Sequence, residues 1–170
     1  MSLKGAKLID FTGTVSGFDH QNGYGDAVVK LLRGPAENKV VVVIDRGSQM
    51  QNKQPQLVLD HVNLTGANPL CGPNDPCGER FPVVNGIYLT EFGEDALDKL
   101  PRGIAGGLKS GVQLQPQEAD RLRELGVDFC CYNLVPTMLI AAHAGWKVVA
   151  LVVPEGTTLD EKVANCLKGK

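Results

Sequence analysis

Runs of apolar residues alternate along the chain with segments that carry helix signals. Residues 40–44 are five consecutive β-branched residues, the pattern of a strand that is buried on both faces. Residues 148–153 repeat this apolar pattern near the other end of the chain. Weaker patterns of the same kind predict strands at 7–11, 56–62, 86–89, 104–108 and 129–132.

Helix signals separate several of these strands. Residues 116–125 carry apolar side chains at helical spacing between Pro116, which suits a first turn, and Gly126, which suits a C-terminal cap. The other predicted helices span 27–32 after a cap at Asp26, 94–100, 136–143, and a last segment through 167 that begins with a capping box at Thr158 and Glu161. This alternation predicts an α/β fold with a mixed, mainly parallel central sheet flanked by helices, in a single domain of residues 1–170.

The overall composition argues against several classes of function. The 17 basic and 19 acidic residues give a net charge of -2, which does not favour a basic nucleic-acid grip or a polybasic membrane tether. Aromatic residues make up 5% of the chain, too few to favour a stacking platform for single strands. Apolar runs stay shorter than the roughly 18–20 residues of a membrane helix, and the N-terminal segment lacks the apolar core of a signal peptide. We therefore expect a cytoplasmic protein that binds neither nucleic acid nor membrane.

The cysteines and histidines do not have the spacing of a metal site. Cys71 and Cys77 are six positions apart in the sequence, which is not the spacing of a zinc ligand pair. Reduced structural thiols are the favoured interpretation, and a disulfide between these two residues is the alternative. The sequence thus predicts no metal and no cofactor.

Two other groups leave alternatives open. Asp45 and Arg46 follow the strongest predicted strand, in an ordinary turn or in an anion site to which Arg46 adds charge. His143 precedes Gly145 and is typical of a packed histidine at a helix end, whereas His61 at a strand end fits either a structural or a functional role.

A long loop at 64–85 is the most informative segment. Residues 60–75 are DHVNLTGANPLCGPND, followed by GERFP at 78–82. This segment closely resembles the trimeric purine nucleoside phosphorylase family, in which the loop is D-H-I-N-L-x-G-x-N-P-L-x-G-P-N followed by R-F-P. A second match, in the right order, covers PQEADRLRELGVD at 116–128, VP at 135–136 and AHAG at 142–145, similar to the family's P-A-E-x-x-x-L-x-x-L-G-A-D, V-P-E and R-H-C-G.

The resemblance implies a fold, an assembly and a chemistry. Family members are homotrimers with a mixed α/β sheet, and they cleave purine nucleosides with phosphate as the nucleophile. Purine, nucleoside and phosphate are thus the implied ligands. The long loop lies near the subunit contact in the family, and the residue that matches Phe81 reaches the neighbour's ribose site.

At most of the positions where the family binds its substrates, this sequence departs from the family pattern. The phosphate-region candidates by resemblance are His20, Asp45, Arg46 and Asn133, and the nucleoside-region candidates are Phe81, Leu114, Tyr132 and Gly156. Phe18 stands where the family has a phosphate-binding arginine, Leu114 where it has a purine-binding glutamate, and Asn133 where it has a phosphate-binding serine.

These departures predict a truncated, degenerate homologue. Its scaffold and interface motifs are kept, but it lacks most of the family's N-terminal part and standard phosphorolysis. One alternative is an active phosphorylase or nucleoside hydrolase-like enzyme with a rebuilt site. Another is a partner subunit whose site is completed by a second chain.

Overall fold

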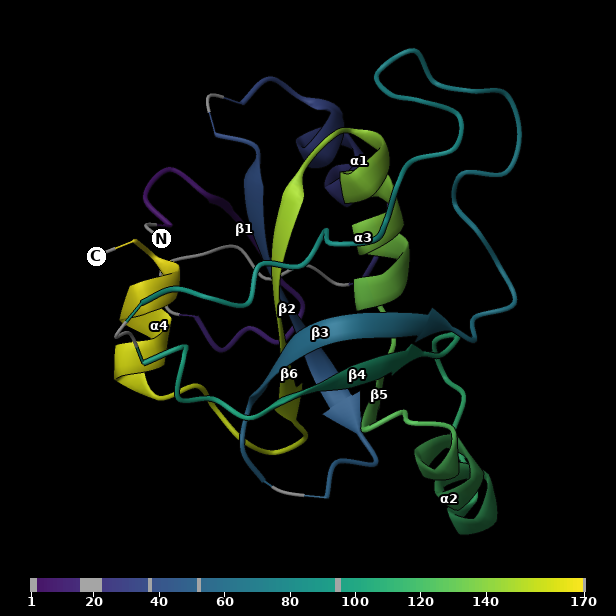
Figure 1. Cartoon of the computed structure of the whole chain (residues 1–170), viewed down its shortest axis with the longest axis vertical. Coiled ribbons are helices and arrows are strands. Elements are labelled where there is room, and N and C mark those ends of the chain that lie inside the picture. Colours follow the sequence, from purple (N-terminus) through teal and green to yellow (C-terminus); the bar gives the residue numbers. More distant parts are fainter. Residues whose placement is uncertain (1–2, 16–22, 37, 52, 94–95, 170) are drawn as a thin grey trace.

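Strands and helices alternate along residues 3–15, 23–36, 38–51, 53–93 and 96–169, the part of the chain that the computed structural model describes. The strands are β1 Lys7–Asp10, β2 Val40–Ser48, β3 Gln56–Asn63, β4 Arg102–Gly107, β5 Phe129–Cys131 and β6 Lys147–Pro154 (Figure 1). The helices are α1 Asp26–Arg33, α2 Pro116–Glu124, α3 Leu134–His143 and α4 Glu161–Leu167.

The strands form one mixed sheet that closes on itself. β2 pairs in parallel with β1 and β6, and its last two residues pair antiparallel with β5. β5, β4 and β3 follow in parallel, and β3 then pairs antiparallel with β6, where Gln56 lies opposite Val152. The predicted α/β fold with a mixed sheet is confirmed. The expected central sheet flanked by helices is instead a closed, barrel-like sheet with few helices (Figure 1).

Buried side chains of β2 alternate between two apolar clusters, because successive residues of a strand point to opposite faces. Val41 and Val43 belong to the cluster that includes α1 and α3. Val42 and Ile44 belong to the cluster that includes α4. Both faces of this strand are therefore buried, as its β-branched run predicts.

Several predicted boundaries are wrong in detail. β2 continues to Ser48 instead of ending at residue 44. Residues 86–89 contribute an isolated bridge between Tyr88 and Val148 and no longer strand. Residues 96–99 form a turn where a helix was expected, and residues 94–95 of that prediction lie outside the described residues.

The helix starts differ from prediction for local reasons. α1 begins at Asp26 itself, with Gly25 as its N-cap and no side-chain cap. α4 is capped by Asp160, whose carboxylate accepts from the backbone N–H of Lys162, so the expected cap at Thr158 is wrong. α2 begins at Pro116 as predicted.

Candidate functional site

Asp45 belongs to β2, and its fully buried carboxylate contacts the start of α3. Its Oδ2 accepts hydrogen bonds from the backbone N–H groups of Tyr132 (3.1 Å), Asn133 (2.6 Å) and Leu134 (2.9 Å). Its Oδ1 accepts from the side-chain amide of Asn133 (3.0 Å) and from the backbone N–H of Arg46 (2.9 Å). A helix start offers N–H groups without partners and a positive dipole end, so it is a natural anion site. Here a carboxylate of the chain itself occupies that position.

Two opposing effects act on this carboxylate. Burial raises the pKa of Asp45, because it penalises the charged form. The hydrogen bonds from Asn133, Leu134 and Arg46 act in the other direction. The donors thus offset part of the cost of burying a negative charge.

Arg46 points away from Asp45, as neighbouring residues of a strand must. Its guanidinium donates to the backbone carbonyls of Thr157 (2.8 Å), Thr12 (3.1 Å) and Pro154 (3.3 Å). The turn expected at residues 45–48 is therefore wrong, because these residues continue β2. As a result, the two side chains do not face one shared anion position.

An open cleft of about 420 Å³ lies beside Asn133. The polar residues that line it include Tyr24, Thr65, Lys109, Ser110, Tyr132 and Asn133. The Oδ1 of Asn133 accepts from the backbone N–H of Tyr24 at 3.1 Å, which fixes one wall. The hydroxyl of Tyr132 donates to the carbonyl of Val112 at 3.2 Å. The cleft combines hydrogen-bonding groups with two aromatic rings.

Among the described residues, the remaining sequence candidates do not line this cleft. Leu114 is partly buried against a small apolar cluster that also contacts Tyr132. Phe81 is 82% exposed on the long loop, and Gly156 is exposed in the turn after β6 with φ 72°. His20 lies outside the described residues, as does Phe18. The structure thus brings Asp45, Tyr132 and Asn133 together, with Leu114 packed on the apolar cluster beside Tyr132, whereas Phe81 and Gly156 are exposed elsewhere.

His61 has a structural environment. Its Nδ1 lies 3.2 Å from the hydroxyl of Tyr88, and the two rings meet edge to face. Burial lowers the pKa of His61, and the charge of Asp60 acts in the opposite direction. This packing against Tyr88 favours the structural one of the two roles that the sequence left open for His61.

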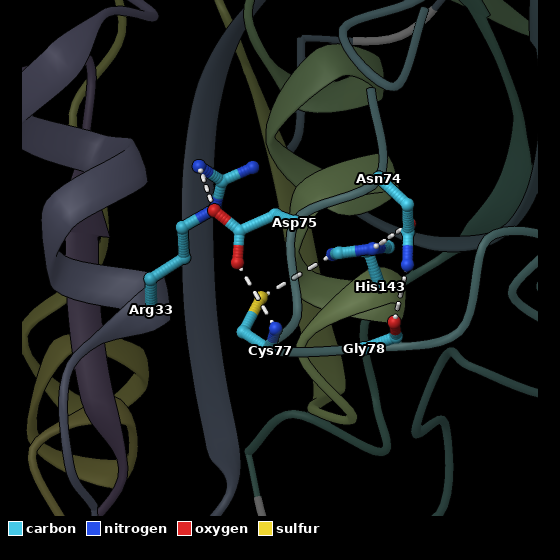
Figure 2. Close-up of polar contacts among 6 residues, drawn as sticks. All are labelled: Arg33, Asn74, Asp75, Cys77, Gly78 and His143. Atoms are coloured by element: carbon cyan, nitrogen blue, oxygen red, sulfur yellow. Dashed lines mark hydrogen bonds and ion pairs between the residues drawn. The ribbon is translucent and has the colours of Figure 1, made fainter. Parts of the chain in front are cut away.

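The long loop docks on the C-terminal end of α3, a contact that sequence reasoning missed (Figure 2). His143 is buried, as its pattern predicts, and its Nε2 lies 3.1 Å from Oδ1 of Asn74. A Cβ at Gly78 would overlap the carbonyl oxygen of His143, so only glycine allows this approach. The family pattern held a usable signal for this contact, because it includes both the loop at 60–82 and the helix end at 142–145.

Neither a metal-binding cluster nor a membrane-spanning helix is present among the described residues. Within them, no three or more His, Cys, Asp or Glu side chains are grouped so as to hold a metal ion. In the same ranges, no helix has the length and apolar character needed to span a membrane. The cytoplasmic location expected from composition stays a prediction.

The fold resembles that of solved purine nucleoside phosphorylases. Schistosoma purine nucleoside phosphorylase in complex with guanosine has a TM-score of 0.59 and 23% identity, covering 72% of this chain and 55% of that chain. The Schistosoma enzyme in complex with hypoxanthine gives a TM-score of 0.60 at 20% identity, covering 76% and 56%. These likenesses show the fold alone.

Sequence relatives agree with the fold. Purine nucleoside phosphorylase 1 of Geobacillus stearothermophilus is 27% identical over 164 residues, which is 88% of this chain and 59% of the relative. Purine nucleoside phosphorylase 1 of Bacillus subtilis is 31% identical over 104 residues, 56% of this chain and 38% of the relative. No protein-family model matches the chain. The chain is therefore a divergent, partial relative of the purine nucleoside phosphorylase family, and it spans little more than half the length of the first of these relatives.

Proposed function

We propose that this protein is a phosphorylase-like binding protein that does not carry out standard phosphorolysis of purine nucleosides. One observation carries the proposal: the Asp45 carboxylate takes the backbone donors at the start of α3. By resemblance, Asp45 and Asn133 lie in the phosphate region. A phosphate there would meet a negative charge, and two like charges about 4 Å apart repel by about 1–4 kcal/mol.

The other charged and polar groups of the implied site support the same proposal. Arg46 donates to three backbone carbonyls of the chain. Leu114, at the position of the purine-binding glutamate by resemblance, cannot hydrogen-bond a purine. The loss of one charged hydrogen bond costs about 1.5–3 kcal/mol, or tenfold to over a hundredfold in rate.

We propose that residues 1–170 act as one phosphorylase-like domain. Its ligand is a purine or a nucleoside, and no phosphate binds beside that ligand. The open cleft beside Asn133 supports this choice, because its Tyr24 and Tyr132 rings and its polar groups suit a flat heterocycle. No phosphate is needed for such binding.

A second candidate function is nucleoside hydrolysis, in which water replaces phosphate as the nucleophile. The same cleft favours it, since Tyr132, Asn133 and Lys109 offer polar groups to a bound nucleoside and to water. Hydrolysis would release free base with no dependence on phosphate.

One assay separates these functions. Guanosine is incubated with the full chain with and without phosphate, free guanine is measured by chromatography, and guanosine binding is measured by calorimetry. We expect binding without release of guanine. Phosphate-dependent release, at the level of the Geobacillus stearothermophilus enzyme run alongside, would overturn the proposal. Phosphate-independent release that is lost in Asn133→Ala would establish the hydrolase instead.

We also propose that the chain assembles as a homotrimer, as the resemblance implies. Two apolar side chains of the long loop support a contact there, because Phe81 is 82% and Val83 is 78% exposed. Light scattering should give three times the chain mass, and the double variant Phe81→Ser, Val83→Ser should give a smaller species. A monomeric wild-type chain at micromolar concentration would contradict this proposal.

A further inference from the structure

A chain of hydrogen bonds orients the imidazole of His143 where the long loop meets α3 (Figure 2). The Nδ2 of Asn74 donates to the carbonyl of Gly78 at 3.0 Å, so its Oδ1 must face His143. That oxygen can only accept, and it lies 3.1 Å from Nε2 of His143. Nε2 therefore carries the proton of the neutral ring.

The other ring nitrogen then has a lone pair, and it faces a thiol. Nδ1 of His143 lies 3.4 Å from Sγ of Cys77. This is a nucleophile in contact with a base that a third group orients, the arrangement by which proteins activate thiols. Cys77 is exposed, so a reagent in solution can reach its sulfur.

The surroundings make this thiol depend on its base. Partial burial raises the pKa of Cys77, as do a hydrogen bond between its thiol and the Asp75 carboxylate and the charge of that carboxylate, while the charges of Arg33 and Lys39 act in the opposite direction. The Asp75 carboxylate is itself paired with the Arg33 guanidinium at 2.8 Å. The sulfur therefore lies among two cations and one carboxylate, a setting that favours an anionic reagent.

We propose that Cys77 is a thiolation site for anionic low-molecular-weight disulfides, with His143 as its base. The sulfur of Cys77 attacks one sulfur of the disulfide while the thiol proton moves to Nδ1 of His143. A bond forms between Cys77 and that sulfur, the disulfide bond of the reagent breaks, and a thiolate leaves. The imidazolium then returns its proton to solvent or to the departing thiolate. The inference rests on the loop contacts alone and is independent of the proposed function.

The chain supplies a matched control on the same loop. Cys71 is also exposed, and among the contacts of the described residues its sulfur has no histidine partner. Cys130 and Cys131 are buried, and Cys166 is partly buried. A comparison of the variants Cys71→Ser and Cys77→Ser therefore isolates the effect of the base.

The test uses dithiobis(nitrobenzoate), an anionic disulfide whose released thiolate is coloured, on the folded full chain. General base assistance contributes about a hundredfold or more where it operates, so we expect Cys77 in the Cys71→Ser variant to react at least about tenfold faster than Cys71 in the Cys77→Ser variant. Peptide mass spectrometry identifies the modified residue. The cationic disulfide cystamine should show a smaller preference for Cys77. Equal rates for the two cysteines would overturn the proposal.

The role of His143 is tested by adding His143→Gln to both cysteine variants. A base role lowers the rate of Cys77 and leaves that of Cys71 unchanged, whereas a loosened loop changes both. A folded His143→Gln variant with an unchanged Cys77 rate would also overturn the proposal. If that variant does not fold, Asn74→Ala takes its place, because it removes the group that fixes the imidazole, and the same two outcomes decide.

Discussion

The variant Asp45→Ala tests whether a carboxylate of the chain fills the anion position at the start of α3. The substitution removes the acceptor of five hydrogen bonds, three of them from consecutive backbone N–H groups. Each buried donor left without a partner costs about 1–3 kcal/mol, and water that enters the space recovers part of it. We therefore expect the free energy of unfolding to fall by about 3–5 kcal/mol.

The same variant should gain an anion site. With the carboxylate gone, the N–H groups of Tyr132, Asn133 and Leu134 can hold a phosphate oxygen. A ligand at a hundred times its dissociation constant stabilises the folded state by about 2.7 kcal/mol. Phosphate should thus restore much of the stability lost in Asp45→Ala and leave the wild-type chain unchanged.

The assay is urea unfolding in increasing phosphate, with sodium chloride added to hold the ionic strength constant. Asp45→Asn is the matched control, because its amide retains one acceptor oxygen and fills the space that phosphate needs. It should be destabilised without rescue by phosphate. A wild-type chain that phosphate stabilises as strongly as it does Asp45→Ala would refute the reasoning, as would an Asp45→Ala variant of wild-type stability.

Three further predictions concern other contacts. Gly78→Ala places a Cβ against the carbonyl of His143, so it should lower the free energy of unfolding, measured with urea, by about 1–3 kcal/mol. Gly25→Ala is the control, because Gly25 has open space around it, and it should change this free energy by about 0.5 kcal/mol or less. Burial lowers the pKa of His61 below the ordinary value of about 6.5, so protonation of this residue favours the unfolded chain. The free energy of unfolding should therefore fall as the pH drops below about 6.5. In His61→Gln, the fall in the free energy of unfolding between about pH 7.5 and about pH 5.5 should be smaller. Arg46→Met should lower the free energy of unfolding by about 1–3 kcal/mol, because it removes the guanidinium that donates to three backbone carbonyls. Urea unfolding of the variant measures this, and a variant of wild-type stability would contradict it.

The sequence predicts those parts of the fold that local chemistry decides. The β-branched run at 40–44 favours a buried strand, and Pro116 marks the start of α2 because its missing N–H costs nothing there. The closure of the sheet escapes such reasoning. It depends on the pairing of Gln56 with Val152, residues far apart in the chain, and no local pattern encodes that register.

The candidate site was predictable only in part for a similar reason. Resemblance pointed to Asp45 and Asn133, but the polar sequence after residue 44 indicated a turn. The donors that hold Asp45 lie 87–89 residues further on, so its pairing emerges only in the folded chain. The docking of Asn74 on His143, separated by 69 residues, was missed on the same grounds.

The extension of β2 links the fold to the proposed loss of phosphorolysis. In a turn, Asp45 and Arg46 could both present groups to one ligand. In a strand, their side chains must diverge, so Asp45 faces α3 and Arg46 faces the carbonyls of Thr12 and Thr157. The arginine therefore cannot neutralise a phosphate next to Asp45, and restoring phosphate binding requires removal of the carboxylate rather than addition of another cation.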